Sequence, residues 1–176
     1  IQRPAIMAGY RIPGITSDDN KAIEMVSSVL STGKSSRVYK KMVDEKKNSL
    51  QVGSFNNSME DYGAYILYAI PNNNTDIDTL LKDIDEEIVK LQTELISEAE
   101  FTKLQNQFEN DYLENNNRMI KVAENLATGY TFYKNINNIN VELDKIRKIT
   151  RQDIQLVAKK YLNPNQRVLL YYLPKK

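Results

Sequence analysis

Two strand-like segments that follow each other closely constrain the fold most. Residues 50–58 (LQVGSFNNS) and 62–71 (YGAYILYAIP) are rich in aromatic and branched residues, and a short polar stretch separates them. This length and spacing are typical of a β-hairpin, whose strands run antiparallel. Two more strand-like segments, 5–13 and 167–174, lie near the two ends of the sequence. The chain is therefore expected to build a mostly antiparallel sheet.

The segments between these strands carry apolar residues at helical spacing. One helix is expected after Thr16 or Ser17, with Gly33 as its stop, and a shorter helix precedes the hairpin. A third helix is expected from Asp76 onward, with Ile84, Ile88 and Leu91 on its buried stripe.

The last third of the chain is predicted to be helical before the closing strand. Ser97 and Glu100 predict a capping box that opens a long helix, and residues 114–117 (ENNN) are expected to interrupt it. Met119, Val122, Ala123, Leu126 and Tyr130 are expected to resume its buried stripe. Two short helices follow, the second capped by Thr150 with Asp153 nearby. Strands and helices segregate, which predicts the α+β class, with a helix layer covering a mostly antiparallel sheet.

Residues 1–176 are expected to form a single domain, because no internal repeat or low-complexity linker divides them. The abrupt start predicts a fragment of a longer chain. The 24 basic and 23 acidic residues nearly cancel, which argues against a nucleic-acid partner. No apolar run approaches the roughly 18 residues of a membrane span. We therefore expect a soluble domain.

Two residue types are absent from the sequence, and their absence limits the catalytic and metal-binding chemistry of the chain. The chain contains no His and no Cys, so it offers no imidazole, no thiolate and no His- or Cys-ligated zinc. Whatever this chain does, it therefore does not use the most common catalytic side chains or zinc ligands.

The stretch STGKSS (31–36) resembles the end of a phosphate-binding P-loop. That motif needs a Gly five residues before Gly33, where this chain has Ser28 on a predicted helix. It also follows a strand, whereas this stretch follows a helix. A turn between two helices, with Gly33 as the stop, is favoured over a nucleotide site.

Two groups of polar side chains suggest other sites. Asp83 and Glu87 share a helix face, and further acids follow on the long helix, but a solvated face is favoured over a catalytic or cation-binding pair. Tyr residues on the predicted strands could line an edge that accepts an extended peptide, although packing in the core is favoured for any one of them.

The motifs, taken in order, resemble the insulinase/pitrilysin family of peptidases in its mitochondrial-processing-peptidase-like branch. LSTGKSSRVYKKMVDEK (30–46) is similar to the family segment L-G-G-G-x-S-S-R-L-y-x-x-L-R-E-E-K. SFNNSMEDYGAYILYAIP (54–71) resembles the family hairpin S-x-x-D-x-G-l-f-x-i-y, and ITRQDIQLVAKKYLNP (149–164) resembles its closing v-T-x-e-D-I-x-x-v-A-x-x-y-l-x-p. Gly33, Ser35, Ser36 and Arg37 match the family turn, with Ser35 or Ser36 as the expected N-cap.

The resemblance implies a role without catalysis in this chain. Family members close two halves around a peptide, and zinc sits on H-x-x-E-H and a distant Glu in the amino-terminal half. This chain resembles a zinc-free carboxyl-terminal half, which implies zinc and the general base on an upstream domain or partner, a second peptidase-like subunit and an extended peptide substrate.

One departure from the family concerns its Arg/Tyr pair, which helps to hold the substrate. The alignment places Val43 and Leu50 at these positions, and neither side chain can donate a hydrogen bond. The chain is therefore either the non-catalytic half of a zinc metalloendopeptidase that needs a partner, which is favoured, or an inactive processing-peptidase-like structural or peptide-binding subunit. The fragment alone is predicted to be inactive, and in a bacterium the cytoplasm or periplasm is expected.

Overall fold

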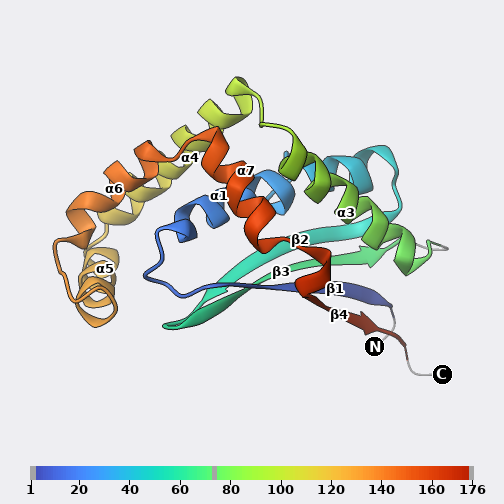
Figure 1. Ribbon diagram of the computed structural model, residues 1–176, viewed down its shortest axis with the longest axis horizontal. Helices are drawn as coiled ribbons and strands as arrows, with labels where there is room; N and C mark the ends of the chain where they lie inside the picture. The colour runs from blue at the N-terminus through green and yellow to red at the C-terminus, as the bar shows by residue number, and fades with distance from the viewer. Residues whose placement is uncertain (1–2, 73–74, 175–176) are drawn as a thin grey trace.

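The computed structural model describes residues 3–72 and 75–174, and four strands form one antiparallel sheet in this part of the chain (Figure 1). The sheet order is β2-β3-β1-β4. The strands are β1 (Ala5–Pro13), β2 (Ser49–Ser58), β3 (Tyr62–Pro71) and β4 (Arg167–Tyr172). The predicted strands and hairpin are confirmed, although the last strand ends two residues before position 174.

Helices fill the intervals between the strands, so the α+β class is confirmed. They are α1 (Asp19–Ser31), α2 (Arg37–Tyr39), the π-helix η1 (Lys40–Glu45), α3 (Ile77–Thr93), α4 (Glu98–Asn116), α5 (Met119–Thr131), α6 (Asn138–Lys148), α7 (Arg151–Tyr161) and the 3₁₀ turn η2 (Pro164–Gln166). Among the described residues, no helix combines the length and apolarity that crossing a membrane requires.

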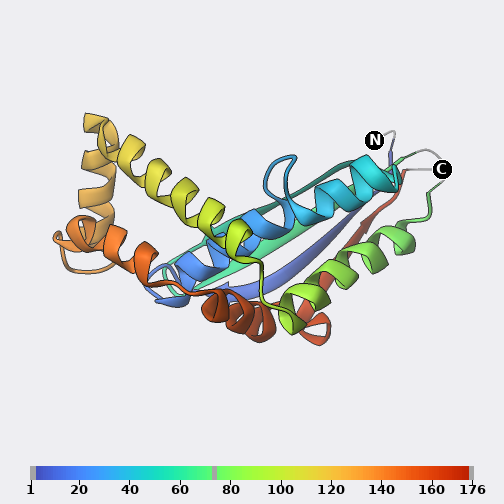
Figure 2. The same cartoon turned by 90° about the horizontal axis from the view of Figure 1, so that it is seen from above.

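One face of the sheet is covered by helices, as Figures 1 and 2 show for α1, α3 and α7. Strand side chains alternate between the two faces, and Ile6, Tyr10 and Ile12 of β1 point into the helix-covered core. Ile84, Ile88 and Leu91 of α3 are buried against it, as the helical spacing predicted. The core thus lies between the sheet and one helix layer.

An arm of three helices, α4 to α6, extends beyond one end of the sheet (Figure 2). The predicted interruption is present, because α4 ends at Asn116 and α5 begins at Met119. The predicted buried stripe on α5 is wrong, since Met119 is 91% exposed and Tyr130 is 70% exposed. The apolar stripe of α5 points away from the body of the molecule.

The helix caps agree with the sequence in part. Thr150 and Asp153 form the predicted capping box at α7. Ser97 accepts a hydrogen bond from the Glu100 amide at 3.2 Å, but the Glu100 carboxylate pairs with Arg37, so the expected box at α4 is only half formed. Helix α1 has Asp18 as its N-cap rather than Thr16 or Ser17.

Candidate functional site

The turn predicted from the family motif links α1 to α2. Gly33 has a φ of +77°, a left-handed conformation that favours glycine, and it follows the end of α1 as predicted. Ser36 is the N-cap residue of α2, but its hydroxyl donates to the Gly33 carbonyl at 2.7 Å instead of accepting from a helix amide. Its hydroxyl therefore closes the turn itself.

Two residues of the same turn reach the start of α4. Arg37 donates to both carboxylate oxygens of Glu100, at 3.1 Å from Nε and 2.7 Å from Nη2. Ser35 Oγ accepts a hydrogen bond from Lys103 at 3.1 Å. Two hydrogen bonds between a guanidinium and a carboxylate fix geometry as well as charge. The turn therefore positions α4 against α2.

Val43 and Leu50, where the resemblance places the lost Arg/Tyr pair, have different surroundings. Val43 lies in the π-helix η1 and packs against the hydrophobic core. Leu50 lies where the register of β2 shifts between Ser49 and Gln51, and its side chain is 43% exposed. Bulges and π-helices recur beside functional sites, yet neither residue offers a polar group here.

Asp83 and Glu87 of α3 are buried, with exposed fractions of 2% and 5%, so the prediction of a solvated helix face is wrong for this pair. Lys41 lies 3.2 Å from Glu87 and donates to the Asp83 carbonyl at 3.1 Å. Lys46 and Asn48 donate to the two carboxylate oxygens of Asp83 at 2.5 and 2.7 Å. The acids thus tie the segment from η1 to β2 onto α3.

The ionisation of this cluster follows from its contacts. Burial alone would raise the pKa of Asp83, but hydrogen bonds from Lys46 and Asn48 hold it below the usual value. Burial would likewise lower the pKa of Lys41, while Glu86 and Glu87 raise it above its ordinary value. Both groups are therefore charged at neutral pH, which suits a structural ion cluster rather than a general acid or base.

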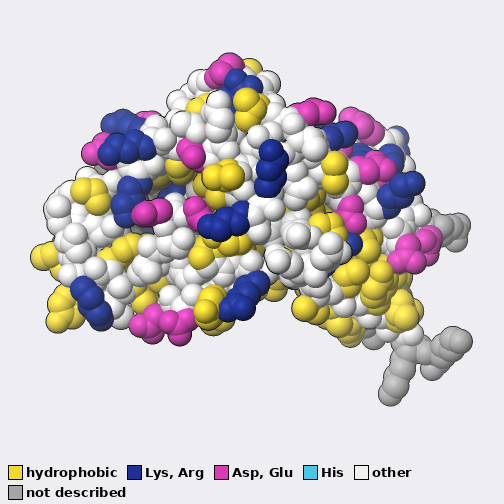
Figure 3. All heavy atoms as spheres, in the orientation of Figure 1, with side chains coloured by type: hydrophobic (Ala, Val, Ile, Leu, Met, Phe, Trp, Pro, Cys, Tyr) yellow, Lys and Arg dark blue, Asp and Glu magenta, His cyan; other side chains and the backbone are white. Residues whose placement is uncertain are grey.

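The face of the sheet opposite the helices is apolar and open. Side chains from neighbouring strands share this face through the register pairs Gly9↔Val168, Met7↔Leu170 and Phe55↔Ile66. Val168, Leu170 and Phe55 are exposed by 75%, 52% and 45%. Hydrophobic side chains gather below α3 in Figure 3, where β1 and β4 lie. Large exposed apolar patches on proteins are typical of interaction surfaces.

The sheet order makes β2 and β4 the two edge strands of the described sheet. Of the tyrosines predicted on strands, Tyr65 is fully buried, and Tyr62, Tyr171 and Tyr172 are exposed. Tyr171 donates to Asp78 of α3 at 2.9 Å, which holds its ring beside the edge. Unpaired edges can accept an extended peptide.

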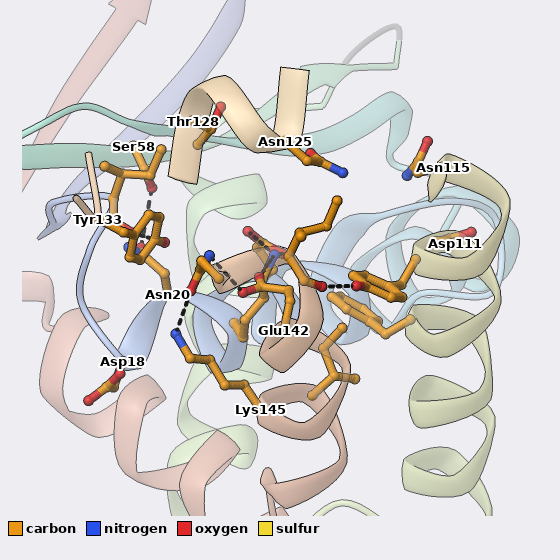
Figure 4. Close-up of a pocket in the computed structure, with 18 of the residues that line it drawn as sticks. Asp18, Asn20, Ser58, Asp111, Asn115, Asn125, Thr128, Tyr133, Glu142 and Lys145 are labelled. Atoms are coloured by element: carbon orange, nitrogen blue, oxygen red, sulfur yellow. Dashed lines mark hydrogen bonds and ion pairs between the residues drawn. The ribbon is translucent and has the colours of Figure 1, made fainter. Parts of the chain in front are cut away.

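A cavity of about 890 Å³ lies between α1, the end of the hairpin and the helical arm (Figure 4). Lys21 of α1 lines this cavity, and its ammonium group lies 3.1 Å from Glu24 and 3.1 Å from Glu142 of α6. Burial alone would lower the pKa of Lys21, but the two carboxylates raise it. Sequence patterns gave no sign of this cavity, because its walls come from segments far apart in the chain.

The chain's own residues do not fit a zinc site. The sequence lacks His and Cys, and the residues described in the structure contain no group of three or more carboxylates placed to hold a metal ion. The buried acids Asp83 and Glu87 are already occupied by lysines.

The fold is that of a peptidase-like domain. Over 99% of its length the chain is similar to a protease from Helicobacter pylori, with a TM-score of 0.90 and 24% sequence identity, and it covers 42% of that protein. It is also similar to an inactive peptidase domain from Bordetella parapertussis, with a TM-score of 0.86 and 20% identity, covering 98% of this chain and 93% of that one.

The sequence identifies the family. Residues 1–108 match the peptidase M16 inactive domain, and the chain belongs to this family, which confirms the resemblance to the insulinase/pitrilysin peptidases. The chain is 26% identical to the zinc protease PqqE of Helicobacter pylori over 169 residues, which is 96% of this chain. It spans 38% of the length of that relative.

Proposed function

We propose that the chain is the non-catalytic half of a zinc metalloendopeptidase and helps to close the chamber that holds an extended peptide. Zinc and the general base then belong to an upstream domain or a partner subunit. The family match and the similarity to a zinc protease support this proposal. The single observation that carries it is the open apolar face of the sheet, which would give a chamber an apolar wall for unfolded peptides.

A reconstitution experiment tests the proposal. A quenched fluorescent peptide is incubated with the H-x-x-E-H-bearing portion of the parent protein, with this chain, and with both. We expect hydrolysis only with both. Hydrolysis by this chain alone, with or without added zinc, would show that it is not a non-catalytic half.

A matched pair of variants tests the sheet face. Leu170→Glu places a charge on the open face, whereas Leu156→Glu places one on α7, where the native side chain is exposed by 61% compared with 52% for Leu170. We expect Leu170→Glu to abolish the stimulation of hydrolysis and Leu156→Glu to preserve it. Equal activity of both variants would exclude the open face as the chamber wall.

A second candidate function is an inactive processing-peptidase-like subunit that binds peptide or stabilises a complex. The absence of hydrogen-bond donors at Val43 and Leu50 is compatible with this alternative as well. Under this alternative the chain associates with a peptidase-like partner, but hydrolysis is unchanged by its addition. The reconstitution experiment with a gel-filtration readout therefore separates the two candidates.

A further inference from the structure

The open face of the sheet carries a single charged side chain. The helices lie on the other side of the sheet in Figure 1. Strands β2 and β3 contain no charged residue, and β1 and β4 contain only Arg11 and Arg167. Arg167 reaches the helix layer, where its guanidinium pairs with Asp85 of α3. Arg11 is therefore the one charge that the four described strands present on the open face.

The neighbours of Arg11 leave its side chain uncovered. It lies on β1 between Tyr10 and Ile12, which point into the core, so Arg11 itself points to the open face. The residue paired with it on β3 is Ala64, which has a small side chain. Strand β4 begins opposite Tyr10, so no residue of β4 is paired with Arg11. The Arg11 side chain is accordingly exposed.

A tyrosine ring holds the guanidinium of Arg11 in place. Arg11 Cζ lies 3.7 Å from the centre of the Tyr62 ring, which is within the range of a cation–π contact. A guanidinium held over a ring keeps N–H groups at its edges, where a carboxylate can accept two hydrogen bonds. The contact with Tyr62 thus orients a hydrogen-bond donor on the open face.

No acid occupies this donor. Within residues 3–72 and 75–174, Arg11 forms neither a hydrogen bond nor an ion pair, and its one recorded side-chain interaction is with Tyr62. Glu60 and Asp61 lie in the hairpin turn next to Tyr62, but neither pairs with Arg11. A lone cation on an otherwise uncharged, apolar face is complementary to an apolar ligand that brings one negative group.

From this arrangement we infer that Arg11 selects, on the open face, an extended peptide that carries one acidic side chain among apolar ones. The carboxylate accepts hydrogen bonds from Arg11, and the apolar side chains of the peptide lie over Val168 and Leu170 further along the face. Tyr62 is a positioning residue, because it acts on the ligand through Arg11. The choice of a peptide as the ligand rests on the proposed function, and the preference for an acid rests on Arg11.

Three capped peptides with a neutral fluorophore test this preference. They alternate Ser and Leu and differ only in one central residue, which is Glu, Gln or Lys. We expect fluorescence anisotropy with the whole chain to show about fivefold tighter binding of the Glu peptide than of the Gln peptide, and the weakest binding of the Lys peptide. High salt should reduce the difference, because ions screen exposed charges. Equal affinities for the Glu and Gln peptides, or no binding of any peptide by the folded chain, would overturn the inference.

A matched pair of variants tests the role of Arg11. Arg11→Gln and Arg118→Gln each remove one exposed charge, and Arg118 lies on the helical arm at the start of α5. We expect Arg11→Gln to abolish the preference for the Glu peptide and Arg118→Gln to keep it. A full preference in Arg11→Gln, or an equal loss in both variants, would overturn the inference.

A second pair of variants tests the positioning role of Tyr62. Tyr62→Leu removes the ring under the guanidinium and should reduce the preference for the Glu peptide about twofold. Tyr62→Phe keeps a ring and should keep the preference. If both variants bind the three peptides as the wild type does, Tyr62 does not position Arg11, and this part of the inference fails.

The outcome can be separated from that of the chamber experiment. Reconstituted hydrolysis that depends on Leu170, together with equal binding of the Glu and Gln peptides, would reject the role of Arg11 and keep the proposed function. A preference for the Glu peptide that requires Arg11, without any stimulation of hydrolysis, would reject the chamber role and keep the Arg11 site.

Discussion

Arg37 and Glu100 form an ion pair with two hydrogen bonds that joins α2 to the first turn of α4, 63 residues further along the chain. We predict that Arg37→Lys lowers the free energy of unfolding by about 1 kcal/mol, because an ammonium group keeps the charge but cannot make both bonds. Urea unfolding followed by circular dichroism measures the change.

A double-mutant cycle with Glu100→Gln separates the pair from other effects of Arg37. The exposed pair Lys121–Glu124, with side chains 44% and 53% exposed, is the control and should show a coupling below about 0.5 kcal/mol. Equal coupling energies for the two pairs would contradict the prediction.

The buried carboxylate of Asp83 should contribute more to the free energy of unfolding than the Arg37–Glu100 pair does. Asp83→Asn removes the charge that faces Lys46 and Lys41, and we predict a loss of about 2–3 kcal/mol at neutral pH. Asp44→Asn, an exposed acid on η1, is the matched control and should change stability by less than about 0.5 kcal/mol. A similar effect of both variants would show that the cluster contributes no specific stability.

The Asp83 contribution should depend on pH. Its pKa is lower in the folded chain than the usual value of 3.8, so the folded state binds this proton less readily than the unfolded state. The contribution is then fully present above pH 3.8 and is lost as the pH falls through the lower folded-state value. The stability difference between wild type and Asp83→Asn, measured from neutral pH to about pH 2, should shrink only in the acidic range.

Lys47 has a φ of +51°, in the left-handed region that a lysine occupies at a cost. We predict that Lys47→Gly raises the free energy of unfolding by about 0.5–1 kcal/mol, because glycine adopts this conformation freely. Lys40→Gly, at a helical φ of −55°, should lower it by about 1 kcal/mol. Differential scanning calorimetry of the two variants should show melting temperatures that move in opposite directions.

Introducing the family's Arg at position 43 and its Tyr at position 50 should change the stability of the chain by different amounts. Val43→Arg forces a charge against the core, and we predict a loss of about 2 kcal/mol or more. Leu50→Tyr enlarges an exposed side chain at a bulge and should change stability by less than about 0.5 kcal/mol. Chemical denaturation checks both values, and equal losses would show that the environments were assigned wrongly.

The strands and most helices could be predicted because their signals are local. The turn between residues 58 and 62 fixes the hairpin, and the Thr150–Asp153 capping box needs only residues three apart. The family turn at Gly33 could also be predicted from the sequence, because the left-handed backbone conformation occurs at a glycine, which adopts it without cost.

The errors concern contacts between distant segments. A helical pattern shows that Asp83 and Glu87 share a face, but it cannot show that Lys41 and Lys46 fold over that face. The stripe on α5 likewise identifies an apolar side and does not say what covers it. The cavity was missed for the same reason, since its walls meet only in the folded chain.

The pairing of β1 with β4 has a consequence for synthesis on the ribosome. The Arg167 side chain donates to the Tyr10 hydroxyl across 157 residues of sequence. Until the segment from 167 to 172 has left the exit tunnel, the nascent chain holds β1 with one side unpaired, next to an already complete hairpin. The four-stranded sheet can therefore be completed only after residues 167–172 have been translated. If synthesis stops before that point, β1 is left as an unpaired, aggregation-prone edge strand that chaperones would have to shield.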